Sequence, residues 1–145
     1  MSPARRLKTA ALVLALLVAG GCADRGPLEV SEARLRALIP GQDKTVGYFT
    51  ARNSSDRDIV LIGASSTAAR AIEMHTTIRD GDVARMRRLP EVVITPQDTV
   101  RFEPGGRHLM LFGVSELGTA TDIVLETADG HRFAVSFETI AVGSG

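Results

Sequence analysis

Short hydrophobic runs separated by turn residues follow one another along most of the chain. Within these runs, apolar side chains recur at every second position, which is the period of a strand with one buried face. Clusters of turn-forming residues such as NSSDRD, RDGD, PGGR and ADGH lie between them. The pattern predicts an all-β Greek-key sandwich, although the first run could instead form one turn of helix over 33–38. We expect the strands within residues 28–38, 45–53, 58–65, 70–78, 83–89, 91–96, 98–104, 107–114, 121–129 and 132–140.

One of these runs, RHLMLFGV at 107–114, places unusual residues away from its apolar face. Leu109 and Leu111 share one face of the expected strand. His108 and Met110 therefore lie together on the other face. A methionine more often fills a gap in a core than forms a site, so the direction of each side chain decides between packing and chemistry.

A second histidine and a second methionine lie in an expected hairpin at residues 70–89. In AIEMHTTI, the alternation puts Met74 on the apolar face and His75 on the opposite face. Asp80-Gly81 is a strong two-residue turn signal, and a hairpin closed there sets His75 directly opposite Met86. The same register puts Arg85 and Arg87 on the face of Met74, which requires a bulge or an irregular stretch.

The four residues form two pairs, each made of one imidazole and one thioether: His75 with Met86, and His108 with Met110. Imidazole and thioether are soft ligands, which favour Cu(I) over magnesium, calcium or manganese. Zinc more commonly binds cysteine, carboxylate or additional histidines. The pattern therefore indicates a copper site. Serine, histidine and aspartate residues occur without a nucleophile elbow or triad spacing, so we expect no enzymatic activity.

The beginning of the chain has the pattern of an export signal. Basic residues in MSPARRLK precede the short apolar run TAALVLALLVAGGC, which is too short to favour a transmembrane helix. AGGC resembles a lipobox, although Ala19 stands where leucine is commonest, so an ordinary signal peptide is the alternative. We expect a lipoprotein signal peptide over 1–21, a lipid-modified Cys22 that begins a tether over 22–30, and one domain over 31–145. The protein would then be periplasmic or otherwise extracytoplasmic and anchored to a membrane.

Cysteine content and charge exclude several classes of function. Cys22 is the only cysteine, so the folded domain has no thiol redox chemistry and lacks the cysteine ligand of an electron-transfer cupredoxin. In an oxidising compartment, a thioether also escapes the thiol–disulfide exchange that would disable a thiolate ligand. Without the leader's Arg5, Arg6 and Lys8, the 17 basic residues fall to 14 against 17 acidic ones, a net charge of −3. This mild acidity argues against a nucleic-acid partner.

The spacing of the four residues, H-x10-M-x21-H-x-M, resembles the signature of the periplasmic copper chaperones called PCu(A)C. VGYFTARNSS and FEPGGRHLMLFGV are also similar to conserved stretches of that family. The resemblance implies a cupredoxin-like β-sandwich with His75, Met86, His108 and Met110 as ligands of Cu(I). It further implies that the protein supplies copper to the CuA centre of cytochrome c oxidase subunit II, alone or with a Sco-type thiol protein.

Three expectations concern the remaining features. Some members of the family have a His- and Met-rich tail, but this sequence ends in TIAVGSG, and we expect no second copper site there. His131, in the turn ADGH, is expected to be a solvated histidine. Arg85, Arg87 and Arg88 flank Met86 and could be either a solvated face or a docking rim for an acidic partner. The main alternative function is a metal-free Ig-like adhesion or assembly lipoprotein, in which the four residues only pack; in either case we expect a monomer.

Overall fold

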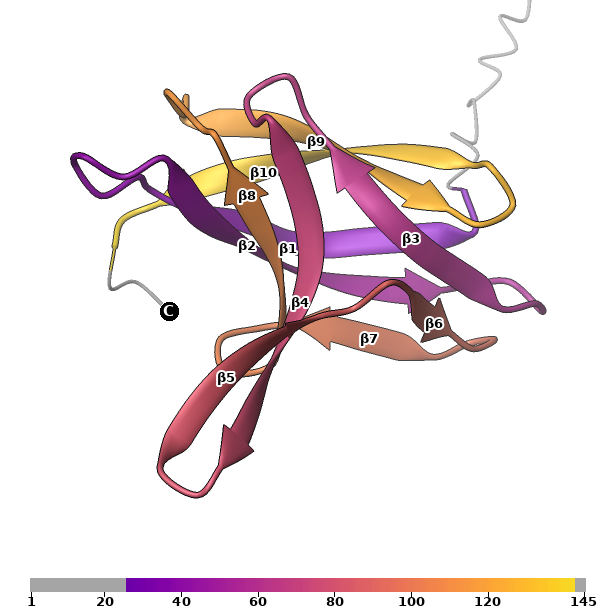
Figure 1. Ribbon diagram of the computed structural model, residues 1–145. Helices are drawn as coiled ribbons and strands as arrows, with labels where there is room; N and C mark the ends of the chain where they lie inside the picture. The colour runs from indigo at the N-terminus through magenta and orange to yellow at the C-terminus, as the bar shows by residue number, and fades with distance from the viewer. Residues whose placement is uncertain (1–25, 143–145) are drawn as a thin grey trace, which may run out of the picture.

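The computed structural model describes residues 26–142, and over this range the protein consists of ten β-strands with no helix (Figure 1). No described helix is therefore long and apolar enough to cross a membrane. Every expected strand is present. The strands are β1 (Leu28–Arg36), β2 (Lys44–Asn53), β3 (Ile59–Ser65), β4 (Ala71–Asp80), β5 (Val83–Arg88), β6 (Val92–Ile94), β7 (Thr99–Phe102), β8 (Arg107–Phe112), β9 (Ala120–Thr127) and β10 (Arg132–Ile140).

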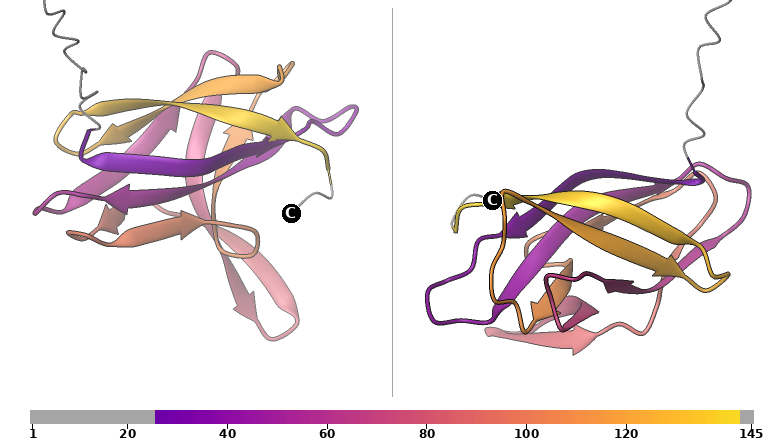
Figure 2. Two further views of the ribbon diagram at one scale, coloured as in Figure 1. Left: turned by 180° about the vertical axis from the view of Figure 1, so that it is seen from behind. Right: turned by 90° about the horizontal axis from the view of Figure 1, so that it is seen from above.

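The strands pair in the order β5-β4-β8-β7-β2-β1-β10-β9-β3-β6. Additional pairing of β4 with β3 and of β8 with β2 brings distant parts of this sheet together, so that it folds over into a sandwich (Figures 1 and 2). Most pairs are antiparallel, whereas β1 with β10 and β7 with β8 are parallel. The crossovers between strands distant in sequence agree with the predicted Greek-key fold.

The first strand differs from expectation in two details. Residues 33–36 continue β1 and are not a helical turn; the strand accommodates a bulge between Ser31 and Arg34, where Glu32 has a φ of 54°. The strand also begins at Leu28, three residues before the expected start of the domain, so the end of the expected tether is part of the sheet. The expected signal peptide and Cys22 lie outside the described residues.

The inward faces of the strands build one hydrophobic core. Phe49, Phe102 and Phe137 lie at its centre: the rings of Phe49 and Phe102 stack at 4.2 Å, and Phe137 meets Phe49 edge to face at 5.8 Å. Leu109 and Leu111 are fully buried, as the alternation of β8 predicts. Strand β8 is thereby fixed in the core through one face and leaves the other face for His108 and Met110.

The β4–β5 hairpin extends beyond the sandwich (Figures 1 and 2). All six residues of β5 are exposed, because the hairpin is a single layer with solvent on both sides. Arg85 and Arg87 do share the face of Met74, as predicted, but no bulge is needed to accommodate them. The hairpin simply leaves the core before these positions are reached.

Candidate metal centre

The four predicted ligand residues lie on one outer face of the ribbon formed by β5, β4 and β8. His75 pairs directly with His108 between β4 and β8, and their ring centroids are 5.9 Å apart. Met110 pairs with Glu73, one step along the ribbon from the two histidines. Because side chains directly opposite each other in an antiparallel pair share a face, both histidines and Met110 lie on the same surface.

Met86 lies on this face too, but its position corrects the predicted register. His75 is opposite Arg88, and Met86 is opposite Thr77. The two-residue loop is Gly81-Asp82 rather than Asp80-Gly81: Gly81 takes the first loop position with a φ of 59°, which is the preference of a type II′ turn. Met86 is therefore a diagonal neighbour of His75, a separation that a long side chain can bridge.

His108 is 4% exposed, although it lies on the outer side of its strand. Its Nδ1–H donates to the carbonyl of Gly106 at 3.2 Å, which leaves the lone pair on Nε2. Nε2 is buried and has no hydrogen-bond partner among the described residues. Burial is the main cause that lowers the pKa of His108, followed by a smaller opposing effect of the Gly106 carbonyl and by repulsion from His75. Burial therefore favours the neutral ring that can bind a metal.

The carbonyl of Gly106 is itself held in place by the turn before β8. Gly105, with a φ of 78°, allows the tight PGG turn, in which the amide of Gly106 donates to Glu103 at 3.0 Å. The same Gly106 carbonyl also accepts the amide of Thr77 from β4 at 3.1 Å. The PGG turn thus joins β4 to β8 and orients the ring of His108.

His75 is oriented by a carboxylate. Its Nε2–H donates to Glu73 at 2.8 Å, and the other oxygen of Glu73 lies 3.7 Å from the guanidinium of Arg88. The hydrogen bond from His75 is the main cause that holds the pKa of Glu73 below its usual value. The Nδ1 atom of His75 is left buried and without a partner. A histidine that donates one ring N–H to a carboxylate and keeps the other nitrogen free has the arrangement typical of a metal ligand.

The two methionines differ in exposure. Met86 is 61% exposed on the projecting hairpin. Met110 is partly buried and lines a cavity of about 200 Å³ between the ends of β1, β2 and β8, beside Lys44 and Val46. Met74 is 3% exposed in the core, on the face away from the histidines, as predicted.

The residues present fit a soft monovalent metal. His75 Nδ1 and His108 Nε2 are the only buried side-chain nitrogen or oxygen atoms between residues 26 and 142 that lack a hydrogen-bond partner. Within the same range, no three His, Cys, Asp or Glu side chains gather into a hard-ligand metal cluster. Two imidazoles supplemented by thioethers suit Cu(I) better than zinc or a hard divalent ion.

Glu73 is the residue of the candidate centre that sequence reasoning did not single out. The signal was present, because the alternation of β4 places Glu73 on the face of His75, two residues away. His131, in contrast, is an exposed histidine of the β9–β10 turn, where its Nδ1 lies 3.0 Å from Asp129.

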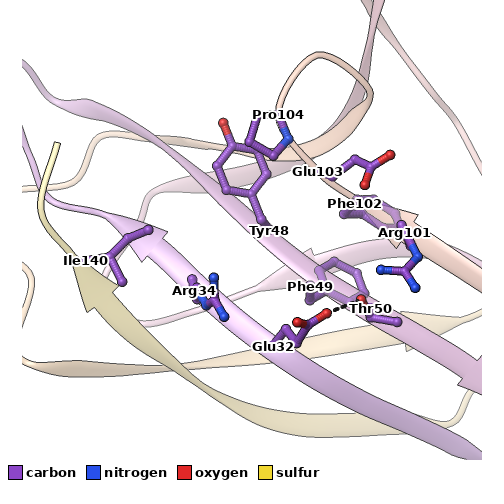
Figure 3. A pocket seen from close by; sticks show the side chains of 10 residues that line it. All are labelled: Glu32, Arg34, Tyr48, Phe49, Thr50, Arg101, Phe102, Glu103, Pro104 and Ile140. Atoms are coloured by element: carbon purple, nitrogen blue, oxygen red, sulfur yellow. Dashed lines mark hydrogen bonds between the residues drawn. The ribbon is translucent and has the colours of Figure 1, made fainter. Parts of the chain in front are cut away.

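A separate pocket of about 160 Å³ lies over β1, β2 and β7 and contains none of the four predicted ligands (Figure 3). Arg34 and Arg101 stand on opposite sides of it, while Tyr48 and Pro104 form one wall. Thr50 donates to Glu32 at 3.0 Å within it. The pocket is an open feature of the sheet surface, separate from the candidate metal centre.

Known proteins are similar to this chain in sequence, and solved structures are similar to it in fold. A family model described as "Putative lipoprotein LpqE-like" matches residues 28–139. "Putative lipoprotein Lxx21020" of Leifsonia xyli subsp. xyli is 27% identical over 153 residues, covering 94% of this chain and 91% of that protein. The solution structure of CuI-DR1885 from Deinococcus radiodurans is 30% identical, with a TM-score of 0.59 over 74% of each chain.

The copper-bound PCuAC domain from PmoF2 is 24% identical, with a TM-score of 0.69 over 80% of this chain and 94% of that domain. This similarity confirms the predicted cupredoxin-like β-sandwich. The family model covers most of the chain, and the solved structure with 30% identity covers about three quarters of it. The chain therefore belongs to the LpqE-like lipoproteins, and to the PCu(A)C family that its sequence motif predicts.

Proposed function

We propose that this protein binds one Cu(I) ion through His75, Met86, His108 and Met110 and carries it outside the cytoplasm as a copper chaperone. The observation that carries the proposal is the pair of buried imidazole nitrogens without partners on the face shared by two thioethers. A buried nitrogen without a hydrogen bond costs folding free energy, roughly 1–3 kcal/mol, and a bound metal ion would offset that cost. Relatives with solved structures, the PmoF2 domain and DR1885, are described as copper-bound.

In this proposal, each group has a different task. Glu73 and the Gly106 carbonyl hold one N–H of each histidine, so that the opposite nitrogens, His75 Nδ1 and His108 Nε2, are available as ligands. Thioethers have no proton to lose and favour Cu(I) over harder ions. Because Met86 is the most exposed of the four groups, it is the ligand that an acceptor could replace first.

The recipient we propose is the CuA centre of cytochrome c oxidase subunit II, reached directly or through a Sco-type thiol protein. This part of the proposal rests on the family resemblance. A lipid on Cys22 would keep the protein at the membrane surface on the outer side, near such an acceptor; its similarity to lipoproteins supports that location.

Competitive titration tests the copper site. The protein, purified in a neutral detergent, is titrated with Cu(I) in the presence of a colorimetric Cu(I) chelator, and bound copper is determined by metal analysis. We expect the wild-type protein to hold one equivalent of Cu(I) per chain against the chelator. The double variant His75→Ala/His108→Ala should hold none. Equal retention of copper by both proteins would overturn the site. Failure of the wild-type protein to hold copper would instead favour the metal-free adhesion or assembly lipoprotein.

Transfer to the proposed recipient is measured separately. Copper-loaded protein is mixed with an apo CuA domain, and the acceptor's absorbance is followed after oxidation of the assembled centre. Loss of copper from the chaperone without formation of a CuA centre would contradict the recipient but not the copper site.

A further inference from the structure

The projecting β4–β5 hairpin has the surface composition of a protein interface. Ile78, Val83 and Met86 are 39%, 52% and 61% exposed, and they are three of the seven exposed large hydrophobic residues in the described chain. Strand β5 also lies at one end of the sheet order, so its outer edge pairs with no other described strand. Methionine and arginine are enriched in protein–protein interfaces, and both occur in this short strand.

Unpaired arginines lie beside Ile78 and Val83, on the face of the hairpin opposite Met86. Thr76 of β4 pairs with Arg87 of β5 on one side and with Arg107 of β8 on the other. The two arginines therefore form a cross-strand row at the base of the hairpin. Arg85 lies one step nearer the tip, opposite Ile78. Between residues 26 and 142, no carboxylate lies within 4.0 Å of these three guanidinium groups. The two acidic residues of the hairpin loop region, Asp80 and Asp82, lie at the tip, beyond the row.

This positive patch is a local feature, because the exported chain has a net charge of −3 once the leader is removed, as counted above. A partner attracted by net charge alone would be basic. A partner that docks on the hairpin must instead present carboxylates to Arg85, Arg87 and Arg107. Local charge at an interface governs orientation and the rate of encounter.

Two kinds of acidic surface could in principle meet the hairpin: an anionic membrane and an acidic protein. The described chain begins at Gly26, beside Phe133 in the β9–β10 hairpin. The β4–β5 hairpin projects from the other end of the molecule, as Figure 1 and the left view of Figure 2 show. If a lipid on Cys22 anchors the protein, the membrane lies near the end of the molecule where the described chain begins, and the hairpin points away from it. The geometry therefore favours a protein.

We propose that the β4–β5 hairpin docks an acidic face of the copper-accepting protein, which makes Met86 the exit ligand; this inference rests on the proposed function. An acceptor that approaches the free edge of β5 meets Met86 on one face and Arg85 and Arg87 on the other. In the transfer step, a ligand of the acceptor binds Cu(I) and the thioether of Met86 leaves. Copper remains Cu(I), and each acceptor thiol that becomes a ligand releases its proton to the buffer.

The experiment compares two synthetic acceptor peptides. Both contain the same two-cysteine Cu(I) site, flanked by glutamates in one and by lysines in the other. Copper-loaded full-length protein in neutral detergent is mixed with each peptide, and transfer rates are measured by stopped flow at ~0.01 M and ~1 M salt, where the screening lengths are about 30 Å and 3 Å. We expect the acidic peptide to take copper at least about tenfold faster at low salt, and the difference to vanish at high salt.

Two double variants with the same loss of charge provide the control. Arg85→Gln/Arg87→Gln removes two arginines of the hairpin, and Arg34→Gln/Arg101→Gln removes two from the pocket of Figure 3. The hairpin variant should lose the preference for the acidic peptide and keep its equilibrium affinity for Cu(I). The pocket variant should keep both. A preference for the basic peptide, or an equal loss in both variants, would overturn the docking surface.

A second measurement tests the surface without copper. The acidic peptide, with its cysteines replaced by serine, is titrated into isotope-labelled apoprotein, and backbone amide shifts are recorded. Shifts confined to β4, β5 and the start of β8 support the proposal, and shifts that are absent or centred elsewhere overturn it. If copper is never bound while the peptide still maps to the hairpin, the proposed function fails and the docking surface stands.

Discussion

His75 and His108 face each other across β4 and β8, with their ring centroids 5.9 Å apart and one nitrogen of each ring buried without a partner. The other nitrogen of each ring is occupied, by Glu73 for His75 and by the Gly106 carbonyl for His108. The two free lone pairs are thus selected by neighbouring groups before any ligand arrives. Preorganisation of this kind reduces the ordering that binding would otherwise require.

Exchange of methionine for leucine distinguishes ligation from packing. Leucine and methionine have similar volumes, and such a swap usually costs less than about 1.5 kcal/mol of stability even in a core. Met86→Leu and Met110→Leu should therefore melt close to the wild-type temperature. Each should weaken Cu(I) binding at least tenfold, or about 1.4 kcal/mol, because a hydrocarbon cannot replace the metal–sulfur bond. Competitive Cu(I) titration beside thermal melts measures both effects.

Met74→Leu is the matched control for these swaps. Met74 is on β4 next to His75, but it is buried on the opposite face. Its replacement should leave copper affinity unchanged. If all three variants bind Cu(I) equally well, the thioethers are not ligands.

Glu73→Gln tests the carboxylate that orients His75. Glutamine keeps the size of the side chain but removes its charge, so the hydrogen bond from His75 Nε2–H becomes weaker and the ring is less firmly held. Outer-shell partners of metal-bound histidines typically contribute 10–100-fold to affinity, and we expect a loss at the lower end, about tenfold. The nitrogen chemical shifts of His75 should also show a less uniform tautomer in the apoprotein, which a purely structural role would not produce.

Glu126→Gln is the control for that substitution. Glu126 is similarly half-buried and also contacts a basic group, Arg132 at 3.1 Å, but it lies on β9 away from the histidines. It should alter neither copper affinity nor the His75 signals. An equal effect of both substitutions would assign the loss at Glu73 to general electrostatics.

The strands and their faces could be predicted from the sequence because alternation has a period of two, and the core enforces it. Leu109, Leu111 and Met74 are buried where the pattern places them. The register of the β4–β5 hairpin could not be predicted, since Asp80-Gly81 and Gly81-Asp82 both permit a two-residue loop. The two registers differ by an even number of residues, so Met86 stayed on the predicted face and only its partner changed from His75 to Thr77.

The sequence predicts which residues form the candidate site better than it predicts their surroundings. Alternation tells which side of a strand a residue occupies, but it does not tell what covers that side. His108 therefore was expected on an outer face, and the structure shows it buried there. The role of Glu73 depends on a side-chain contact within one strand, which the sequence permits without requiring.

The lowered pKa of His108 gives copper binding and stability a common pH dependence. Folding holds this pKa below the value of about 6.5 expected in the unfolded chain, mainly through burial. The unfolded state thus binds the proton more readily, and the stability associated with His108 is complete above about pH 6.5 and declines as the pH falls toward the lowered pKa. Copper also needs the neutral ring, so affinity should hold through about pH 6.5 and weaken only as the pH falls toward the lowered pKa of His108.

Melts and Cu(I) competition between about pH 8 and pH 5 measure both curves. In His108→Gln, the difference in apoprotein stability across this range should shrink, because the titrating group is gone. A wild-type affinity that stays flat while the apoprotein loses its His108-dependent stability would remove the histidines from the site.

The lipid anchor is tested at Cys22. Cys22→Ala should release the protein from membranes or block its processing, since acylation needs the thiol. Membrane fractionation and the mass of the mature N-terminus measure the outcome. The variant should bind Cu(I) as the wild type does, because the described domain contains no cysteine. A wild-type protein found only in soluble form, with a different first residue, would show that no lipid is attached.

Gly47 is a point where the core admits no side chain. It lies on β2 opposite Leu109, and a Cβ added there would stand 2.9 Å from Leu35 Cδ2, 3.5 Å from Leu109 Cβ and 3.7 Å from Phe137 Cε1. All three neighbours are fully buried and have little freedom to move. Gly47→Ala should therefore lower the free energy of unfolding by about 1–3 kcal/mol, as overpacking of a core usually does.

Gly63→Ala provides the comparison within another strand. A Cβ at Gly63 would meet only a Glu126 carboxylate oxygen, at 3.9 Å, and its backbone does not have a left-handed φ. Alanine there should be neutral or stabilising by up to about 1 kcal/mol, because it restricts the unfolded chain. Denaturant unfolding of both variants measures the difference. If Gly47→Ala is as stable as Gly63→Ala, β2 and β8 can separate slightly at this point, and the face of β8 that carries His108 and Met110 is less rigidly held than the packing of Leu109 implies.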